Sequence, residues 1–89
     1  MKSLLDFDEK GTMRILLALI EEEKNITELR EIEGVGLNAL YNALEALKKL
    51  GLILEREGYY RARIFTLTDK GKRAAKKVIE LKKIIEEEE

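Results

Sequence analysis

The sequence predicts a single α+β domain, mainly α, with a three-helix core, a β-hairpin and a long C-terminal helix. Three observations lead to this fold class. Two helical segments meet at the glycine turn 34–36, two strand-like segments meet near Gly58, and Thr68 opens a last helical segment. At 89 residues the chain suffices for one domain with a modest core. We expect the compact core to span residues 8–68 and the terminal helix residues 69–89.

Composition narrows the classes of protein that fit. Hydrophobic residues make up 45% and charged residues 39% of the chain, and proline is absent, which indicates a folded, helical protein. The longest apolar run, residues 15–20, is too short to span a bilayer, and no signal-peptide pattern is visible. We therefore expect a cytoplasmic protein with no membrane partner. The excess of Lys and Glu and the absence of Gln are typical of thermophile proteins, although a small bundle from an ordinary organism can share them.

Several kinds of chemistry are excluded. The chain has no Cys and no His, which removes disulfides, Cys/His zinc sites and imidazole acid–base catalysis. Ser3 is the only serine, and the carboxylates are scattered without a defined pair. We expect no enzyme activity, no metal and no cofactor.

The net charge of −1 conceals an uneven distribution along the chain. Residues 1–33 hold 5 basic and 9 acidic residues (−4), residues 34–77 hold 10 and 4 (+6), and residues 78–89 hold 2 and 5 (−3). A basic zone of this kind is the electrostatic footprint expected for contact with phosphates. The alternative is that Lys72, Arg73, Lys76 and Lys77 only solvate a helix face.

The first helix is expected to run to about Glu23, with Asp8 or Thr12 as its N-cap. A short apolar lead-in precedes it and would pack on the core or on a second subunit. A one-residue bridge to the hairpin sheet is expected at Ile26. The lead-in consists of Leu4, Leu5 and Phe7, and the apolar stripe of the helix consists of Met13, Leu16, Leu17 and Ile20, widened by Ile15 and Leu19.

The second helix is short and leads into a sharp turn. Thr27 is predicted as its N-cap, with Glu28 in the first turn and Leu29 and Ile32 facing inward. The glycines of 34–36 permit the positive φ that ends one helix and turns the chain into the next. This arrangement indicates a helix-turn-helix elbow.

The third helix is predicted over residues 37–50, and Gly51 is expected to end it as a C′ residue. It has two distinct faces at 100° per residue. The stripe expected to be buried consists of Leu37, Leu40, Leu44 and Leu47. The opposite face consists of Asn38, Asn42, Glu45 and Lys49, flanked by Tyr41 and Lys48.

The remaining segments form the hairpin and the last helix. Strands are expected at 52–55 and 62–67, with a turn centred near Gly58 and Tyr59. Phe65 and Leu67 are assigned to the core. Thr68 is expected to cap the last helix, with Asp69 in its first turn.

The last helix carries a short heptad seam. Such a seam could form a coiled coil with a second copy, or the helix could fold back over its own domain, and the pattern favours a homodimer. The expected dimerisation residues are Ala74, Val78, Leu81 and Ile85.

With these residues placed, residues 12–73 resemble the winged helix-turn-helix domain of MarR-like and PadR-like transcription regulators, and small archaeal winged-helix proteins that dimerise through a C-terminal helix. Three segments carry the resemblance. Thr27-Glu28-Leu29 opens the second helix. The second segment, Leu44-x-x-Leu47-x-x-x-Gly51-Leu52-Ile53, covers the end of the third helix and the residues after it. The third segment, Leu67-Thr68-Asp69-Lys70-Gly71, follows the hairpin.

The resemblance implies a DNA-binding surface on the third helix and on the hairpin, which is the wing. The helix would face the major groove, and the wing would contact the backbone or an adjacent minor groove. The chain lacks the flanking helices of the usual MarR ligand pocket, so no small-molecule effector is expected. The implied DNA-binding residues are Asn38, Tyr41, Asn42, Glu45, Lys48, Lys49, Arg56, Arg61 and Arg63. Tyr59 and Tyr60 at the wing tip could stack on DNA, or could cover the sheet and a partner subunit.

The leading hypothesis is a dimeric, sequence-preferring regulator of transcription that binds double-stranded DNA. One alternative is a protein-interaction winged-helix module of a larger complex, which Glu45, Glu55 and Glu57 mildly favour. Another is a general chromatin-compacting protein, against which the acidic first third of the chain argues.

Overall fold

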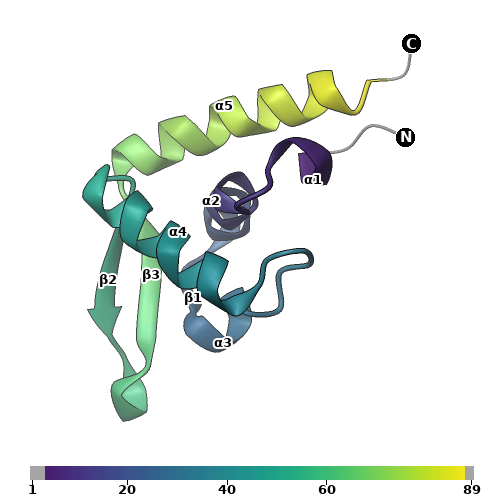
Figure 1. Cartoon of the computed structure of the whole chain (residues 1–89). Helices are drawn as coiled ribbons and strands as arrows, with labels where there is room; N and C mark the ends of the chain where they lie inside the picture. The colour runs from purple at the N-terminus through teal and green to yellow at the C-terminus, as the bar shows by residue number, and fades with distance from the viewer. Residues whose placement is uncertain (1–3, 88–89) are drawn as a thin grey trace.

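The computed structural model describes residues 4–87 and shows a mainly helical α+β fold (Figure 1). The predicted fold class is confirmed: helices and a small antiparallel sheet occur in the expected order. No helix within residues 4–87 is both long and apolar enough to cross a membrane. The elements are α1 (Leu4–Phe7), α2 (Thr12–Glu21), β1 (Lys24–Asn25), α3 (Ile26–Leu29), α4 (Leu37–Lys49), β2 (Ile53–Glu57), the 3₁₀ turn η1 (Tyr59–Arg61), β3 (Arg63–Leu67) and α5 (Asp69–Ile85).

The sheet has three antiparallel strands in the order β1-β3-β2. In the hairpin Glu55 lies opposite Phe65, and Ile53 lies opposite Leu67. On the other side of β3, Lys24 pairs with Phe65. The expected bridge to the sheet therefore exists, but it spans two residues and ends just before Ile26.

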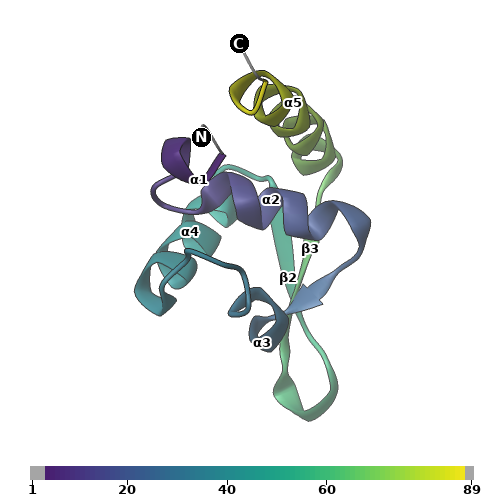
Figure 2. The ribbon, with the colours of Figure 1, turned by 90° about the vertical axis from the view of Figure 1, so that its right-hand side faces the viewer.

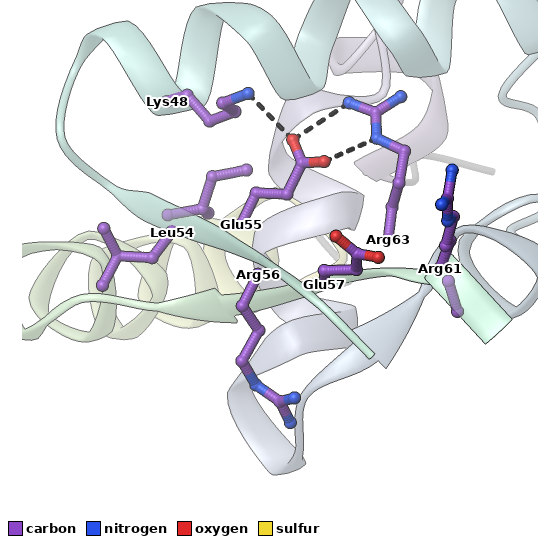
Figure 3. Close-up of a pocket in the computed structure, with 9 residues that line it drawn as sticks. Lys48, Leu54, Glu55, Arg56, Glu57, Arg61 and Arg63 are labelled. Atoms are coloured by element: carbon purple, nitrogen blue, oxygen red, sulfur yellow. Dashed lines mark hydrogen bonds and ion pairs between the residues drawn. The ribbon is translucent and has the colours of Figure 1, made fainter. Parts of the chain in front are cut away.

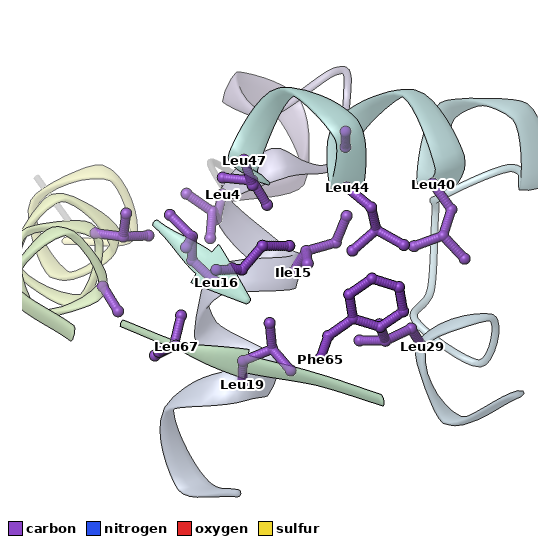
Figure 4. Packing of buried hydrophobic residues seen from close by; sticks show 14 residues of the cluster. Leu4, Ile15, Leu16, Leu19, Leu29, Leu40, Leu44, Leu47, Phe65 and Leu67 are labelled. Atoms are coloured by element: carbon purple, nitrogen blue, oxygen red, sulfur yellow. The ribbon is translucent and has the colours of Figure 1, made fainter. Parts of the chain in front are cut away.

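The core is formed by the inner faces of α2, α4, the sheet and α5 (Figure 4). Phe65 lies near its centre and is fully buried, as are Ile15 of α2 and Leu29 of α3. Burying a side chain of this size contributes roughly 1.5–3 kcal/mol. The expected assignment of Phe65 and Leu67 to the core is confirmed.

The start of α2 differs from the prediction. The N-cap position is Gly11, at φ 78°, and its residue offers no side-chain hydrogen bond. Asp8 instead supplies the missing acceptor from outside the helix, because its Oδ2 accepts from the backbone N–H of Arg14 at 3.0 Å. The same carboxylate pairs with the guanidinium of Arg14, Nε to Oδ2 at 3.3 Å. The helix ends at Glu21, two residues before the predicted end.

The cap of α3 is also corrected. The N-cap is Asn25, whose side chain accepts from the backbone N–H of Glu28 at 2.9 Å, while the Glu28 carboxylate accepts from the backbone N–H of Asn25 at 3.0 Å. This reciprocal pair is a capping box. Thr27 is an exposed residue inside the helix. An asparagine followed three residues later by glutamate is the sequence signal for this cap.

The elbow between α3 and α4 forms as expected, with Gly34 at φ 81°. Three of the four predicted stripe leucines, Leu40, Leu44 and Leu47, are fully buried. Leu37 is not fully buried: 46% of its surface is exposed. It is the first residue of α4, and the preceding glycine has no side chain to cover it.

The start of α5 is bound to the end of α4. Gly51 lies at φ 75°, as predicted for a C′ residue. The Thr68 hydroxyl accepts from the backbone N–H of Gly71 at 3.0 Å and donates to the carbonyl of Gly51 at 2.7 Å. Gly71 is required here, because a Cβ at this position would overlap the carbonyl oxygen of Leu52. The segment Thr68–Gly71 therefore both begins α5 and anchors the end of α4.

α5 lies along α2, at the end of the molecule opposite the hairpin tip (Figures 1 and 2). In the predicted seam Val78 is buried within the chain, and Ala74 and Ile85 pack against the core. The helix therefore folds back over its own domain along part of its length. Whether it also contacts a second copy stays a prediction.

The apolar lead-in is buried at one residue and exposed at another. Leu4 in α1 is buried, whereas 57% of the surface of Phe7 is exposed. The Leu5 side chain lies outside the described part of the structure. The backbone N–H of Leu4 donates to Glu86 Oε2 at 3.3 Å, which places α1 beside the end of α5.

Candidate nucleic-acid interface

The outward face of α4 is polar along its length. Burial of the leucine stripe turns the opposite side of the helix to solvent. Tyr41 lies at the border of this face and is 36% exposed. The fully outward positions are Asn38, Asn42, Glu45 and Lys49.

Glu55 of β2 lies between two cations (Figure 3). Its carboxylate accepts hydrogen bonds from Arg63 Nε at 2.7 Å and Arg63 Nη2 at 3.0 Å, and from Lys48 Nζ at 2.8 Å. Glu45 adds longer pairs, at 3.4 Å to Lys48 Nζ and at 3.8 Å to Arg63 Nη2. These four residues, the Glu55 cluster, join α4 to both strands of the hairpin.

The cluster is charged at neutral pH. The hydrogen bond from Arg63, followed by that from Lys48, lowers the pKa of Glu55 to about 2. The hydrogen bond to Glu55 in turn raises the pKa of Lys48 and the pKa of Arg63. These pKa shifts favour the ionised forms of Glu55, Lys48 and Arg63.

Arg63 is also held between two aromatic rings. Its guanidinium carbon lies 5.3 Å from the ring centroid of Phe65 and 5.7 Å from that of Tyr41 on α4. Cation–π contact adds to the ion pair and restricts the orientation of the guanidinium. Arg63 therefore connects the hairpin to α4 by its planar face as well as by its nitrogen atoms.

Arg56 is occupied by a different partner. It projects from the face of β2 opposite to Glu55 (Figure 3). It forms an ion pair with Glu23 in the segment before β1. About half of each side chain is exposed, so the pair is screened and contributes little to stability. It still reduces the positive charge that this arginine can offer to another molecule.

Other basic side chains lack such partners. Within residues 4–87, Arg61, Lys49 and Arg30 form no ion pair. All three are exposed. They lie at the hairpin tip, on α4 and just after α3, beside the outward face of α4 and the wing.

The hairpin tip adopts an unusual backbone conformation. Tyr60 and Arg61 both have positive φ, 55° and 60°, and the N–H of Ala62 donates to the carbonyl of Tyr59 at 3.0 Å. Residues other than glycine, asparagine and aspartate rarely adopt this region, so the turn is strained. It leaves Tyr59 91% exposed and Tyr60 fully exposed. Neither tyrosine covers the sheet within the subunit.

An open hollow of about 550 Å³ lies on the hairpin and is bordered by Lys48 of α4. Lys48, Glu55, Arg61 and Arg63 line it, together with neighbouring strand residues (Figure 3). Among the described residues 4–87, no group of three or more Asp or Glu side chains could hold a metal ion. The hollow is a charged concave surface next to the polar face of α4.

Solved structures with similar folds include two that are described as transcriptional regulators. A mutant of ZitR from Lactococcus lactis matches with a TM-score of 0.76 and 22% identity, over 84% of this chain and 53% of that chain. A Porphyromonas gingivalis protein, described as a MarR-family transcriptional regulator, matches with a TM-score of 0.76 and 23% identity, over 88% and 79% of the two chains. The chain has the winged helix-turn-helix fold.

A third similar structure is ytfH of Salmonella typhimurium, described as a transcriptional regulator, at 25% identity and a TM-score of 0.73, covering 91% of this chain and 79% of that one. This chain spans about half the length of the ZitR chain. No protein-family model and no curated protein sequence matches the chain. In the winged-helix description, α3 and α4 are the helix-turn-helix pair and β2–β3 is the wing.

The winged-helix fold brings some of the predicted site residues together and separates others. The four outward positions of α4, with Tyr41 beside them, share one helix face. Lys48 and Arg63 belong to the Glu55 cluster, and Arg56 is turned to the other face of β2. Arg61 and the two tyrosines lie at the wing tip.

Sequence reasoning missed the part played by Glu55 and Glu23, which bind the wing arginines. The alternation of side chains along β2 does indicate that Glu55 faces α4. Residues two apart share a face, and Ile53 of the same strand is buried beneath α4. No comparable local pattern links Glu23 to Arg56, because 33 residues separate them.

Proposed function

We propose that this protein is a regulator of transcription that binds double-stranded DNA, with α4 in the major groove and the wing on the backbone or an adjacent minor groove. The observation that carries the proposal is the outward face of α4, where two asparagines and Lys49 are exposed in a winged-helix fold. Similar folds in the solved structures are named as transcription regulators. The groove contacts are our inference from exposure and charge.

The chemistry of this face suits the edges of base pairs. The amide of Asn38 or Asn42 can accept from and donate to adenine at once, and Glu45 can accept from the amino group of cytosine. Lys49 and Arg61 would neutralise phosphates, which adds affinity without reading sequence. The face therefore combines both functions that a sequence-preferring binder needs.

We propose further that the regulator acts as a homodimer. The outer side of α5 supports this, because 66% of the Ile84 surface is exposed, and the exposed Phe7 of α1 lies towards the same end of the molecule. The expected seam contributes Leu81, which is partly exposed, while Val78 is already covered within the subunit. A dimer of this kind would present two α4 helices roughly one helical turn of DNA apart and would prefer an inverted repeat.

A selection of bound sites from random duplex DNA, followed by binding measurements at two salt concentrations, tests the proposed function. We expect an enriched motif and an affinity for it that falls steeply with salt. Asn42→Ala should weaken discrimination between the enriched motif and its variants, whereas Lys76→Ala on α5 should not. Strong binding without enrichment would indicate a general DNA-packing protein.

A protein-interaction module is the second candidate function. The intramolecular pairing of Lys48, Arg56 and Arg63 supports it, because it removes positive charge that phosphates would use. Absence of DNA binding even at low salt would favour this candidate over the first.

A further inference from the structure

We propose that Leu37 is a specificity residue that contacts the 5-methyl group of a thymine in the bound DNA. This inference rests on the proposed function, since it concerns what the exposed end of α4 reads. It adds an apolar contact to the polar face already described.

Leu37 lies at the N-terminal end of α4. It is the first residue of α4, and 46% of its surface is exposed although its periodicity places it near the buried stripe. In helix-turn-helix proteins the N-terminal residues of the second helix contact the base edges. Leu37 precedes Asn38 and lies one turn before Tyr41, so it borders the polar face at the end that would enter the groove.

Leu37 lies beside a small hollow with a mainly apolar wall. A small hollow of about 200 Å³ is lined by Leu37, Val35, Leu40 and Arg30. Val35 is fixed from behind, because it packs so closely on Gly11 that a Cβ there would overlap it. The wall of the hollow is therefore apolar and held in place by the packing of α2.

The chemistry of the occupant follows from this wall and its charge. The only methyl group on the major-groove edge of the standard bases is that of thymine, at C5. Arg30 at the rim has no ion-pair partner within residues 4–87, so it can meet a phosphate of the same strand. An aliphatic pocket with this cation at its rim fits a thymine nucleotide better than it fits a cytosine, which would bring a polar amino group.

The test removes the methyl group without changing any hydrogen bond. In the enriched duplex, each thymine is replaced in turn by deoxyuridine, and affinity is measured for the wild type, Leu37→Ala and Leu50→Ala. Leu50 is a matched control, because it lies at the opposite end of the same helix and is 57% exposed. Thermal unfolding of the three proteins verifies that they are equally folded.

We expect one thymine per half-site at which deoxyuridine weakens wild-type binding by about fourfold, the effect of losing one buried methyl group. The loss should persist in Leu50→Ala and disappear in Leu37→Ala. If DNA is bound selectively but the penalty is absent, or is unchanged in Leu37→Ala, the assignment of Leu37 is wrong and the proposed function stands. If no DNA is bound selectively, both fail together.

Discussion

Glu55 determines how much charge the wing can offer. Its carboxylate accepts from both Lys48 and Arg63, and all three side chains are at least partly accessible to solvent. Removing Glu55 would leave Lys48 and Arg63 with only their longer ion pairs to Glu45. A negative charge beside DNA would by itself be unfavourable, but Glu55 holds the wing against α4.

The pKa of Glu55 predicts a loss of stability in acid. Because folding lowers this pKa from 4.5 to about 2, the folded state favours the ionised carboxylate. The resulting stability is present above about pH 4.5 and is lost as the pH falls towards 2. Chemical denaturation at several pH values should show a steeper loss over this range for the wild type than for Glu55→Gln. Glu57→Gln, on the same strand, is the control and should retain the wild-type slope.

The wing arginines should have different effects on DNA binding. Arg61 has no ion-pair partner within residues 4–87, so Arg61→Ala should weaken binding to all sequences and reduce the salt slope by about 1. Arg56→Ala should have a smaller effect, because its charge is already compensated by Glu23. Fluorescence anisotropy over a salt series measures both quantities. Equal slopes for the two variants would show that the ion pair of Arg56 does not matter for binding.

At the scale of elements, short polar motifs determine where helices begin. The capping box of α3 and the hydroxyl of Thr68 at α5 each satisfy a backbone N–H of the first turn. The first of these also places β1, because Asn25 is both the N-cap of α3 and a partner of Ile64 in the sheet. A four-residue helix thereby gains a defined start and a defined place beside β3.

The capping box can be tested by comparing two neighbouring alanine variants. Asn25→Ala should lower the free energy of unfolding by about 1 kcal/mol, because the N–H of Glu28 loses its acceptor. Thr27→Ala should change it by less than about 0.5 kcal/mol, since Thr27 is exposed within the helix. Urea denaturation followed by circular dichroism measures both. A larger effect at Thr27 would indicate that Thr27 is the N-cap, as predicted from the sequence.

At the scale of the whole molecule, α5 and the wing tip lie at opposite ends (Figures 1 and 2). The longest dimension of the molecule is 48 Å. A second copy bound to the outer side of α5 would therefore leave both wings and both α4 helices uncovered.

The proposed dimer predicts a specific disruption. Ile84→Glu should convert the dimer to a monomer, because it places a charge in an apolar contact, and it should not unfold the subunit, because Ile84 is exposed there. Lys83→Glu, at an exposed neighbouring position, is the control and should leave the dimer intact. Sedimentation velocity measures the outcome. A monomeric wild type, or a dimeric Ile84→Glu, would contradict the proposed interface.

Local signals allowed much of the fold to be predicted from the sequence. The period of the leucines placed α4 within a residue of its observed end, and Gly51 and Thr68 marked the end and the start of helices because both act within a few residues. The start of α3 was missed because Thr27 is itself a good capping residue, although Asn25 followed by Glu28 carries the capping-box signal. The hairpin was expected from its β-rich segments, but its strained tip was not.

By itself, the sequence determined the order of the elements, the elbow, the helix termini that glycine and threonine mark, and a polar face on α4, since each depends on residues a few positions apart. Only the tertiary structure decided that Glu55 and Glu23 bind the wing arginines, that Val78 is covered within the subunit and that Leu37 is left exposed. Ion pairing and burial depend on which distant segments come together, and the packing of the sheet, α2 and α5 decides that.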